Sequence, residues 1–248
     1  MARIGLFGAL LAAATLLAGA TQAGIGTEAA PLRVLFIGNS LTRSNDLPAR
    51  VAELAAASGR ELQYRTVAWP GFSLEDHWSF GAARPALASG VWDVVVMQDG
   101  PSVAPWEDPE HLSTWASRFA DLAREAGTRP ALLTVWPDRE RRSLLPEVVA
   151  SYRLAAQAAG ADLFPAGEAW QAVWRCSPYM WLYSSDGIHP SRLGTYEAAL
   201  VVYGALYDAP VRSRRLYLVG ERPQTSRLLQ AAAATALGRW LPASGRCG

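Results

Sequence analysis

Residues 93–97 constrain the fold of this chain more than any other segment. After Asp93 the chain runs Val94-Val95-Val96-Met97, an apolar stretch with no polar alternation. Such a stretch is expected of a strand that is covered on both faces, as in a parallel sheet packed between helices. Parallel strands need long crossover connections, so the remaining chain should alternate between short strands and helices.

The chain shows this alternation from residue 33 to residue 207. Strands are predicted over 33–37, 62–66, 92–97, 131–135 and 161–164, and helices over 47–58, 75–80, 111–126, 144–159, 166–174 and 191–206. This order predicts an α/β fold with three layers and a central parallel sheet of about five strands. The pattern then weakens, with an added edge strand expected over 216–219 and a last helix over 226–241.

The first 23 residues have the features of a secretory signal. Arg3 is followed by an apolar, Ala-rich run and by small residues before Ala23. We expect cleavage there, a secreted or periplasmic protein and no stable membrane anchor. The expected organisation is a signal peptide (1–23), a short lead (24–32), one main α/β domain (33–211) and a C-terminal extension packed on it (212–248).

The sequence has two cysteines, Cys176 and Cys247, and both lie in the part expected to be exported. Thiols can pair outside the reducing cytosol. We therefore predict a disulfide that ties the C-terminal tail to the domain.

Composition excludes several kinds of chemistry. All 23 basic residues are Arg, so Schiff-base enzymes, Ser-Lys dyads and P-loop NTPases are excluded. The formal net charge of +1 argues against nucleic acid as a partner. The histidines lack H-E-x-x-H spacing and the cysteines lack zinc spacing, so no metal or other cofactor is expected. The sequence does not indicate an oligomeric state.

Candidate catalytic residues follow the predicted strands, where ligands bind in open α/β sheets. Ser40 lies in Gly38-Asn39-Ser40-Leu41-Thr42, after the first strand. Taken alone, Ser40 or Asn45 could simply cap the next helix. A serine nucleophile needs a base, and an imidazole needs an acceptor that orients it.

Asp186-Gly187-Ile188-His189-Pro190 supplies both groups within five residues. Pro190 disfavours the α conformation at His189, which keeps the imidazole out of the following helix. His189 is therefore the candidate base and Asp186 its orienting acid. His77 is expected on a helix surface and His111 in the first turn of a helix.

Two further turns offer donors for an oxyanion. Trp69-Pro70-Gly71 follows the second strand, and Gln98-Asp99-Gly100-Pro101-Ser102 follows the third. A glycine N–H and a side-chain amide are both suitable donors.

Together, the Val34–Thr42 block and the block from Asp186 to Ser191 resemble the first and last motifs of the SGNH (GDSL-type) hydrolase superfamily. The resemblance spans about residues 33–207 and implies a flavodoxin-like fold. It also implies that Ser40 is the nucleophile, His189 the base, Asp186 the orienting acid, and Ser40 and Gly71 the oxyanion donors through their N–H groups. Asn39 stands where the GDSL name has Asp.

The sequence departs from the family at the third motif, Gly-x-Asn-Asp, which is absent after the third strand. Either Gln98 supplies the missing amide or Ser102 takes the position of the asparagine. We favour Gln98, because an amide is the closest chemical substitute and it lies at the end of the strand.

The predicted function is an exported serine esterase that cleaves a carboxylic ester through an acyl-enzyme, with a small molecule or glycan ester as partner. An acetylated carbohydrate is a reasonable substrate, because several tryptophans are expected near the site. These are Trp69, Trp78, Trp106, Trp136 and Trp181. The alternative is a non-catalytic glycan-binding module on the same scaffold, and the intact Ser, His and Asp set argues against it.

Overall fold

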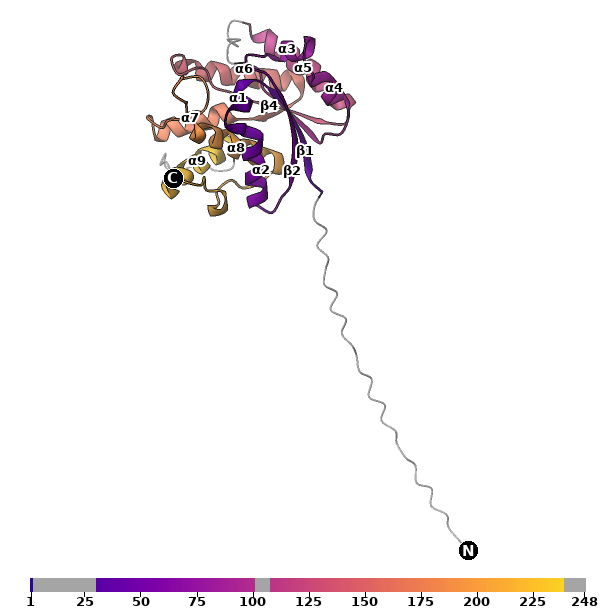
Figure 1. The fold of residues 1–248 in the computed structure, drawn as a ribbon, viewed down its shortest axis with the longest axis vertical. Helices are drawn as coiled ribbons and strands as arrows, with labels where there is room; N and C mark the ends of the chain where they lie inside the picture. Colours follow the sequence, from indigo (N-terminus) through magenta and orange to yellow (C-terminus); the bar gives the residue numbers. More distant parts are fainter. Residues whose placement is uncertain (2–29, 101–107, 239–248) are drawn as a thin grey trace.

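The protein is an α/β structure built on one parallel sheet (Figure 1). The computed structural model describes Met1 and residues 30–100 and 108–238. The sheet has five strands in the order β2-β1-β3-β4-β5. They are β1 (Leu32–Gly38), β2 (Leu62–Ala68), β3 (Val94–Met97), β4 (Arg129–Leu133) and β5 (Asp162–Phe164). The predicted fold class is confirmed, and this order is the flavodoxin-like one.

Helices cover the sheet in two layers, which follow from the right-handed crossovers of parallel strands (Figure 1). One layer contains α2 (Leu47–Ala57), α7 (Ala166–Cys176), α8 (Arg192–Tyr207) and α9 (Pro223–Ala236). The other contains α3 (Leu74–Ser79), α4 (Ala83–Ala88), α5 (Pro109–Glu125) and α6 (Leu145–Ala159). A short helix, α1 (Ser40–Arg43), follows β1 directly.

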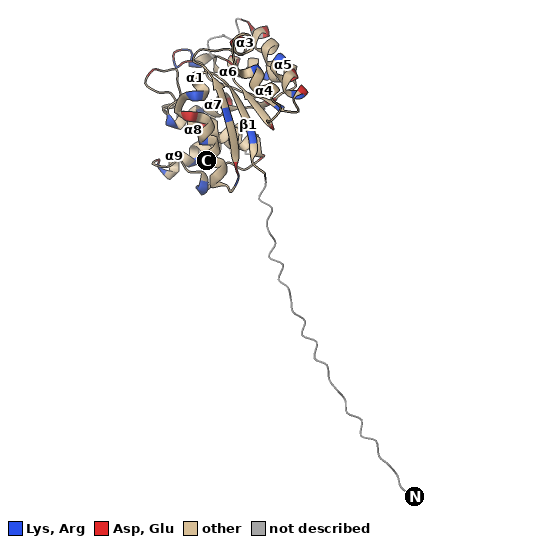
Figure 2. Cartoon of the chain, turned by 45° about the vertical axis from the view of Figure 1, so that its right-hand side comes forward, with Lys and Arg blue, Asp and Glu red and all other residues tan. Residues whose placement is uncertain are grey.

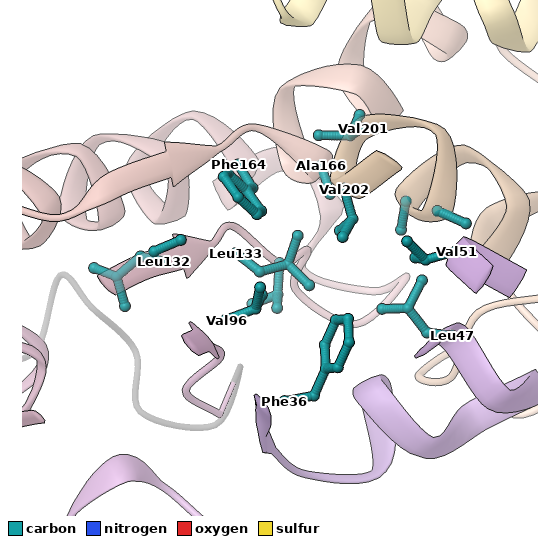
Figure 3. Packing of buried hydrophobic residues seen from close by; sticks show 14 of the residues in the cluster. Phe36, Leu47, Val51, Val96, Leu132, Leu133, Phe164, Ala166, Val201 and Val202 are labelled. Carbon is teal, nitrogen blue, oxygen red and sulfur yellow. The ribbon is translucent and has the colours of Figure 1, made fainter. Parts of the chain in front are cut away.

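The core forms where side chains of the sheet meet the helices. Figure 3 shows Phe36 of β1 beside Leu47 of α2, and Phe164 of β5 near Val201 of α8. Every residue of β3 is buried, because helices cover both faces of this central strand. The apolar run Val94–Met97 is therefore a strand with two covered faces.

Most predicted elements are present, and the differences have local causes. All five strands and all six helices of the predicted core occur within a few residues of their expected bounds. A capping box formed by Ser73 and Asp76 begins α3. Helices α1 and α4 were not predicted, because four and six residues are too few to show a helical period.

The predicted edge strand at 216–219 is wrong. The Ser213 side chain accepts a hydrogen bond from the N–H of Arg215 and begins a 3₁₀ turn, Arg214–Leu216. The N–H of Leu218 donates to Ser226 Oγ rather than to a strand. Helix α9 begins at Pro223, earlier than expected, because proline suits the first helical position.

The C-terminal helix α9 packs against α7 and α8, and Leu229 and Ala233 on it are fully buried. Cys176, at the end of α7, is disulfide-bonded. Its predicted partner Cys247 lies outside the described residues, as does the predicted signal segment after Met1. The domain boundary at residue 211 stays a prediction.

Among the described helices, none is long and apolar enough to cross a membrane. Basic and acidic residues both occur on several elements in the view of Figure 2.

Candidate active site

The candidate residues of the first three strands meet at one edge of the sheet. In the register of the sheet, Gly38 pairs with Ala68, and Ile37 pairs with Met97. The carboxyl ends of β1, β2 and β3 are therefore side by side. Ser40, the Pro70-Gly71 turn and Gln98 follow these three ends, as ligand-binding residues do in open α/β sheets.

Ser40 is the first residue of α1, and Asn39 caps this helix. Asn39 Oδ1 accepts a hydrogen bond from the N–H of Leu41 at 3.0 Å. Ser40 is half-buried. Among the described residues, neither its hydroxyl nor its N–H has a protein partner. The possibility that Ser40 serves only as a helix cap is thus removed, and both of its polar groups can meet a substrate.

The turn that carries Ser40 is fixed by the buried side chain of Gln98. Gln98 Oε1 accepts hydrogen bonds from the N–H of Asn39 at 3.0 Å and from Thr42 Oγ1 at 2.9 Å. Gly38 is required here by crowding, since a Cβ would lie 2.5 Å from Thr42 Oγ1 and 2.6 Å from Gln98 Oε1. A larger residue at position 38 would push apart the contacts that hold the turn.

These contacts correct the role predicted for Gln98. Its Nε2 donates to the carbonyl of Asp99, and the residue is 1% exposed. The amide that was expected to face an oxyanion is instead buried, and it holds the Ser40 turn through hydrogen bonds to Asn39 and Thr42. The alternative donor, Ser102, lies outside the described residues.

The second donor turn lies against the Ser40 turn. The N–H of Phe72 donates to the carbonyl of Trp69 and closes a turn in which Gly71 has a φ of 75°. Proline followed by a glycine of positive φ is the signature of a type II turn. Asn39 Nδ2 donates to the carbonyl of Phe72 at 3.1 Å, so one side chain joins both turns.

The N–H of Gly71 has no acceptor among the described residues, and Gly71 is exposed. The site therefore presents two free backbone donors, on Ser40 and on Gly71, from turns that Asn39 ties together. Sequence reasoning identified both donors but missed this role of Asn39.

His77 is a further residue of the site that the sequence reasoning missed. It was expected on a helix surface, and this prediction is wrong, because the side chain is 0% exposed. Its Nε2 lies 2.6 Å from the carbonyl oxygen of Gly38. A carbonyl only accepts, so Nε2 carries the proton. Burial lowers the pKa of His77, which keeps the ring neutral.

The Asp186–His189 loop brings the predicted acid and base together. Asp186 Oδ2 lies 2.6 Å from His189 Nδ1. Asp186 Oδ1 accepts hydrogen bonds from Ser184 Oγ and from the N–H groups of Ile188 and His189, at 2.7, 2.8 and 3.0 Å. These bonds, first those from Ser184 and His189, lower the pKa of Asp186 well below its usual range.

The carboxylate of Asp186 therefore stays ionised and holds His189 with Nδ1 as donor, which leaves Nε2 to act as a base. His189 itself is half-buried.

The loop and the serine turn are joined across the site. Asn45, just after α1, donates from Nδ2 to the carbonyl of Pro190 and to Thr195 Oγ1, both at 2.9 Å. Asn45 has a φ of 52°, in the left-handed region. Among the described residues, no hydrogen bond joins Ser40 Oγ to His189. Such bonds often tighten only in the substrate complex.

The buried carboxyl group of Asp99 lies just after the end of β3. Asp99 is 2% exposed, and its Oδ1 accepts from the N–H groups of Leu74 and Gly100. Its Oδ2 has no partner among the residues that the structure describes, and burial raises the pKa of this carboxyl group. Asp99 thus anchors the start of α3, which carries His77.

The tryptophans expected near the site divide into two groups. Trp69 and Trp181 are exposed, at 51% and 73%. Trp136 is buried and stacks on Trp170, and Trp78 packs against Phe119. Trp106 lies outside the described residues.

No family model and no curated protein matches the chain. Among solved structures, a protein from Slackia heliotrinireducens assigned to the SGNH hydrolases is 30% identical. It aligns with 70% of this chain and 98% of its own, at a TM-score of 0.58. The chain belongs to the SGNH hydrolases.

Two other structures share the SGNH fold. A DUF4886 family protein from Bacteroides uniformis is 20% identical, with a TM-score of 0.73 over 84% of this chain and 95% of its own. The psychrotrophic esterase EstA from Pseudoalteromonas sp., in a structure inhibited by monoethylphosphonate, is 13% identical. Its TM-score is 0.53 over 71% of this chain and 97% of its own. At these identities the likeness shows the fold alone.

Proposed function

We propose that this SGNH hydrolase is a serine esterase in which Ser40, His189 and Asp186 form the catalytic triad. The observation that carries the proposal is the Asp186–His189 pair, hydrogen-bonded at 2.6 Å on a loop that Asn45 joins to the serine turn. The free hydroxyl of Ser40 and the two free backbone donors beside it support the same reading.

Acylation begins with the substrate carbonyl against the N–H groups of Ser40 and Gly71. Ser40 Oγ attacks the carbonyl carbon while His189 Nε2 accepts the hydroxyl proton. The negative charge that develops on the carbonyl oxygen is stabilised by the two N–H groups, each worth about 3 kcal/mol. The intermediate then collapses, and His189 returns the proton to the departing alcohol oxygen.

Deacylation repeats these steps with water. His189 Nε2 accepts a proton from water, whose oxygen attacks the acyl carbon. The bond to Ser40 Oγ breaks, and Ser40 regains a proton from His189. Asp186 stays ionised throughout and stabilises the imidazolium that forms twice in each cycle.

We also propose that the enzyme is exported, on the Ala-rich N-terminal segment that resembles a secretory signal. An acetylated carbohydrate is the proposed substrate. Trp69, beside the Gly71 donor, is half-exposed, and its ring could stack on a sugar. The esterase named among the structural neighbours supports ester chemistry.

Hydrolysis of p-nitrophenyl acetate by matched serine variants tests this function. Ser40→Ala should lower kcat/KM by about 10⁴-fold or more, because it removes the nucleophile. Ser44→Ala is the control, since Ser44 lies one helical turn away and its hydroxyl, within the described part of the chain, bonds only the carbonyl of Ser40. Ser44→Ala should stay within a few-fold of wild type. A Ser40→Ala enzyme as active as wild type would overturn the proposal.

A further inference from the structure

A pocket with no role in the steps above lies behind the Asp186–His189 loop. It has a volume of about 180 Å³. Its lining includes Arg139 and Arg142 from the connection between β4 and α6, Trp174 near the end of α7, and Tyr179, Trp181 and Tyr183 from the chain that leads into the loop. Drug-sized ligands occupy pockets of about 300–1,000 Å³, so this one has room for a single ring.

The pocket wall and the catalytic loop are one structure. The N–H of Ser184 donates to the carbonyl of His189, and the N–H of Ser191 donates to that of Leu182. Tyr183 pairs with Pro190 as an antiparallel bridge. A ligand bound in the pocket would therefore contact the segment that is hydrogen-bonded to the loop carrying His189.

Aromatic rings form the floor and rim of the pocket. Trp174 and Tyr183 are buried and lie nearly parallel, with ring centroids 5.6 Å apart. Tyr179 and Trp181 stand at the rim and are 91% and 73% exposed. Large aromatic side chains this exposed are costly in water and suit a ligand with an apolar face.

Two arginines make the pocket positive. The guanidinium of Arg142 lies 4.0 Å above the Trp174 ring, and one of its nitrogens donates to the carbonyl of Pro178. Arg139 is fixed by its N–H, which donates to the carbonyl of Gly187 at 2.7 Å. The Arg139 guanidinium lies beside the Cα of Gly187 in the catalytic loop.

Neither guanidinium forms an ion pair within the described part of the chain. The neighbouring Asp138 is ion-paired with Arg141 instead. Arg139 and Arg142 thus keep donors for an anionic ligand, and a planar guanidinium matches a carboxylate well.

We propose that this pocket is a subsite for the alcohol part of the substrate, and that it takes a sugar ring that carries a carboxylate. The inference rests on the proposed esterase function. The rim rings would cover the face of the sugar, and the two guanidinium groups would bind its carboxylate. The ester of such a sugar would then lie toward His189 and Ser40.

Binding of methyl glucuronide to the wild-type protein, measured by calorimetry, tests the subsite without any catalysis. Methyl glucuronide should bind at least tenfold more tightly than methyl glucoside, benzoate or inorganic phosphate. Equal binding of methyl glucoside would overturn the role of the arginines. Equal binding of benzoate or phosphate would overturn the sugar acid as ligand, and no binding would overturn the subsite.

Three arginine variants locate the binding. Arg139→Gln and Arg142→Gln should each weaken methyl glucuronide binding at least fivefold. Arg141→Gln is the matched control, because it removes the same charge from the same segment while Arg141 faces Asp138. An equal loss in Arg141→Gln would show a general charge effect and overturn the subsite.

The two proposals fail in different ways. Wild-type protein that hydrolyses p-nitrophenyl acetate but does not prefer methyl glucuronide overturns the subsite alone. Protein that binds methyl glucuronide but hydrolyses no ester overturns the esterase, and with it the assignment of the pocket to an alcohol group.

Discussion

The serine turn and the histidine loop are held in opposite ways. The turn around Ser40 is fixed by side chains far away in sequence, since Gln98 lies 59 residues from Asn39, and His77 lies 39 residues from Gly38. The acid–base pair within the loop is held locally, because Asp186 bonds residues two and three positions away. Arg139 and Asn45 bond the backbone of the loop at Gly187 and Pro190, but neither bonds Asp186 or the His189 ring among the described residues. The position of the nucleophile thus depends on the folded core, whereas the orientation of the base depends on one short segment.

This difference separates structural from chemical effects of mutation. A substitution behind the Ser40 turn should lower both stability and activity. A substitution of the half-exposed His189 ring should lower activity alone. The following predictions are ordered from the largest expected effect to the smallest.

Replacement of His189 by Ala should have the largest effect on activity. Without a base, Ser40 loses its activation, and kcat should fall by about 10⁴-fold. The melting temperature should stay close to that of wild type, because the ring is not part of the core. Ile188→Ala, an exposed neighbour in the same loop, is the control and should retain activity. A His189→Ala protein that unfolds at a much lower temperature would contradict the local character of the loop.

Gln98→Leu tests the long-range character of the serine turn. The N–H of Asn39 and the hydroxyl of Thr42 would lose their buried acceptor, at about 1–3 kcal/mol each. Because the turn would also shift, kcat should fall by about 10²-fold with little change in KM. Chemical denaturation and steady-state kinetics measure the two effects.

Gln63→Leu on β2 is the control for Gln98→Leu, since the Gln63 side chain is exposed and bonds only Glu61 among the described residues. Loss of activity in Gln98→Leu with no loss of stability would contradict the bracing role and restore Gln98 as a group that meets the substrate.

His77→Phe should remove one of the two hydrogen bonds to the carbonyl of Gly38 and lower the free energy of unfolding by about 1 kcal/mol at pH 8. The phenyl ring can take the place of the imidazole beside Phe72, whose ring centroid lies 5.1 Å away. This loss of stability is smaller than that expected for Gln98→Leu, because the N–H of Trp69 still donates to the carbonyl of Gly38.

The effect of pH on this variant has a defined sign. The pKa of His77 is lowered in the folded state, so its contribution to stability is present above the ordinary value of 6.5. It is lost as pH falls below that value, because the unfolded chain binds the proton first. The stability difference between wild type and His77→Phe should therefore shrink from pH 8 to pH 5. A constant difference would mean that the ring is not held neutral by burial.

Asp99→Asn should have the smallest effect, and of opposite sign. The pKa of Asp99 is raised by burial, so its contribution to stability is present below the ordinary value of 3.8 and is lost as pH rises through the folded pKa. Asn removes the buried charge and keeps an oxygen for Leu74 and Gly100. Relative to wild type, the free energy of unfolding of Asp99→Asn should therefore be higher at pH 8 than at pH 3, by about 1 kcal/mol or less, as measured by thermal unfolding.

Asp121→Asn, on the surface of α5, is the control for Asp99→Asn. A variant of Asp99 that is less stable at pH 8 than at pH 3, relative to wild type, would contradict this assignment.

The same comparison explains what the sequence could predict. The Asp186–His189 pair could be predicted from the sequence, because an acid and a base three positions apart on one turn lie close together wherever the loop is placed in the fold. The five strands were visible because apolar runs such as Val94–Met97 report burial directly. His77 and Gln98 were misassigned, because their partners Gly38 and Asn39 lie far from them in sequence, at the end of the neighbouring strand β1. Nothing in a helix with the sequence Leu74–Ser79 indicates that its histidine reaches the carbonyl of Gly38.

Mapping the adduct of an alkylphosphonate probe tests the central claim most directly. Tryptic cleavage after Arg33 and Arg43 releases residues 34–43, whose only serine is Ser40. The account predicts one adduct per chain, on Ser40 in this peptide, formed together with loss of p-nitrophenyl acetate hydrolysis and absent from His189→Ala. An adduct on another peptide, or full hydrolysis by protein that is labelled nowhere, would contradict it.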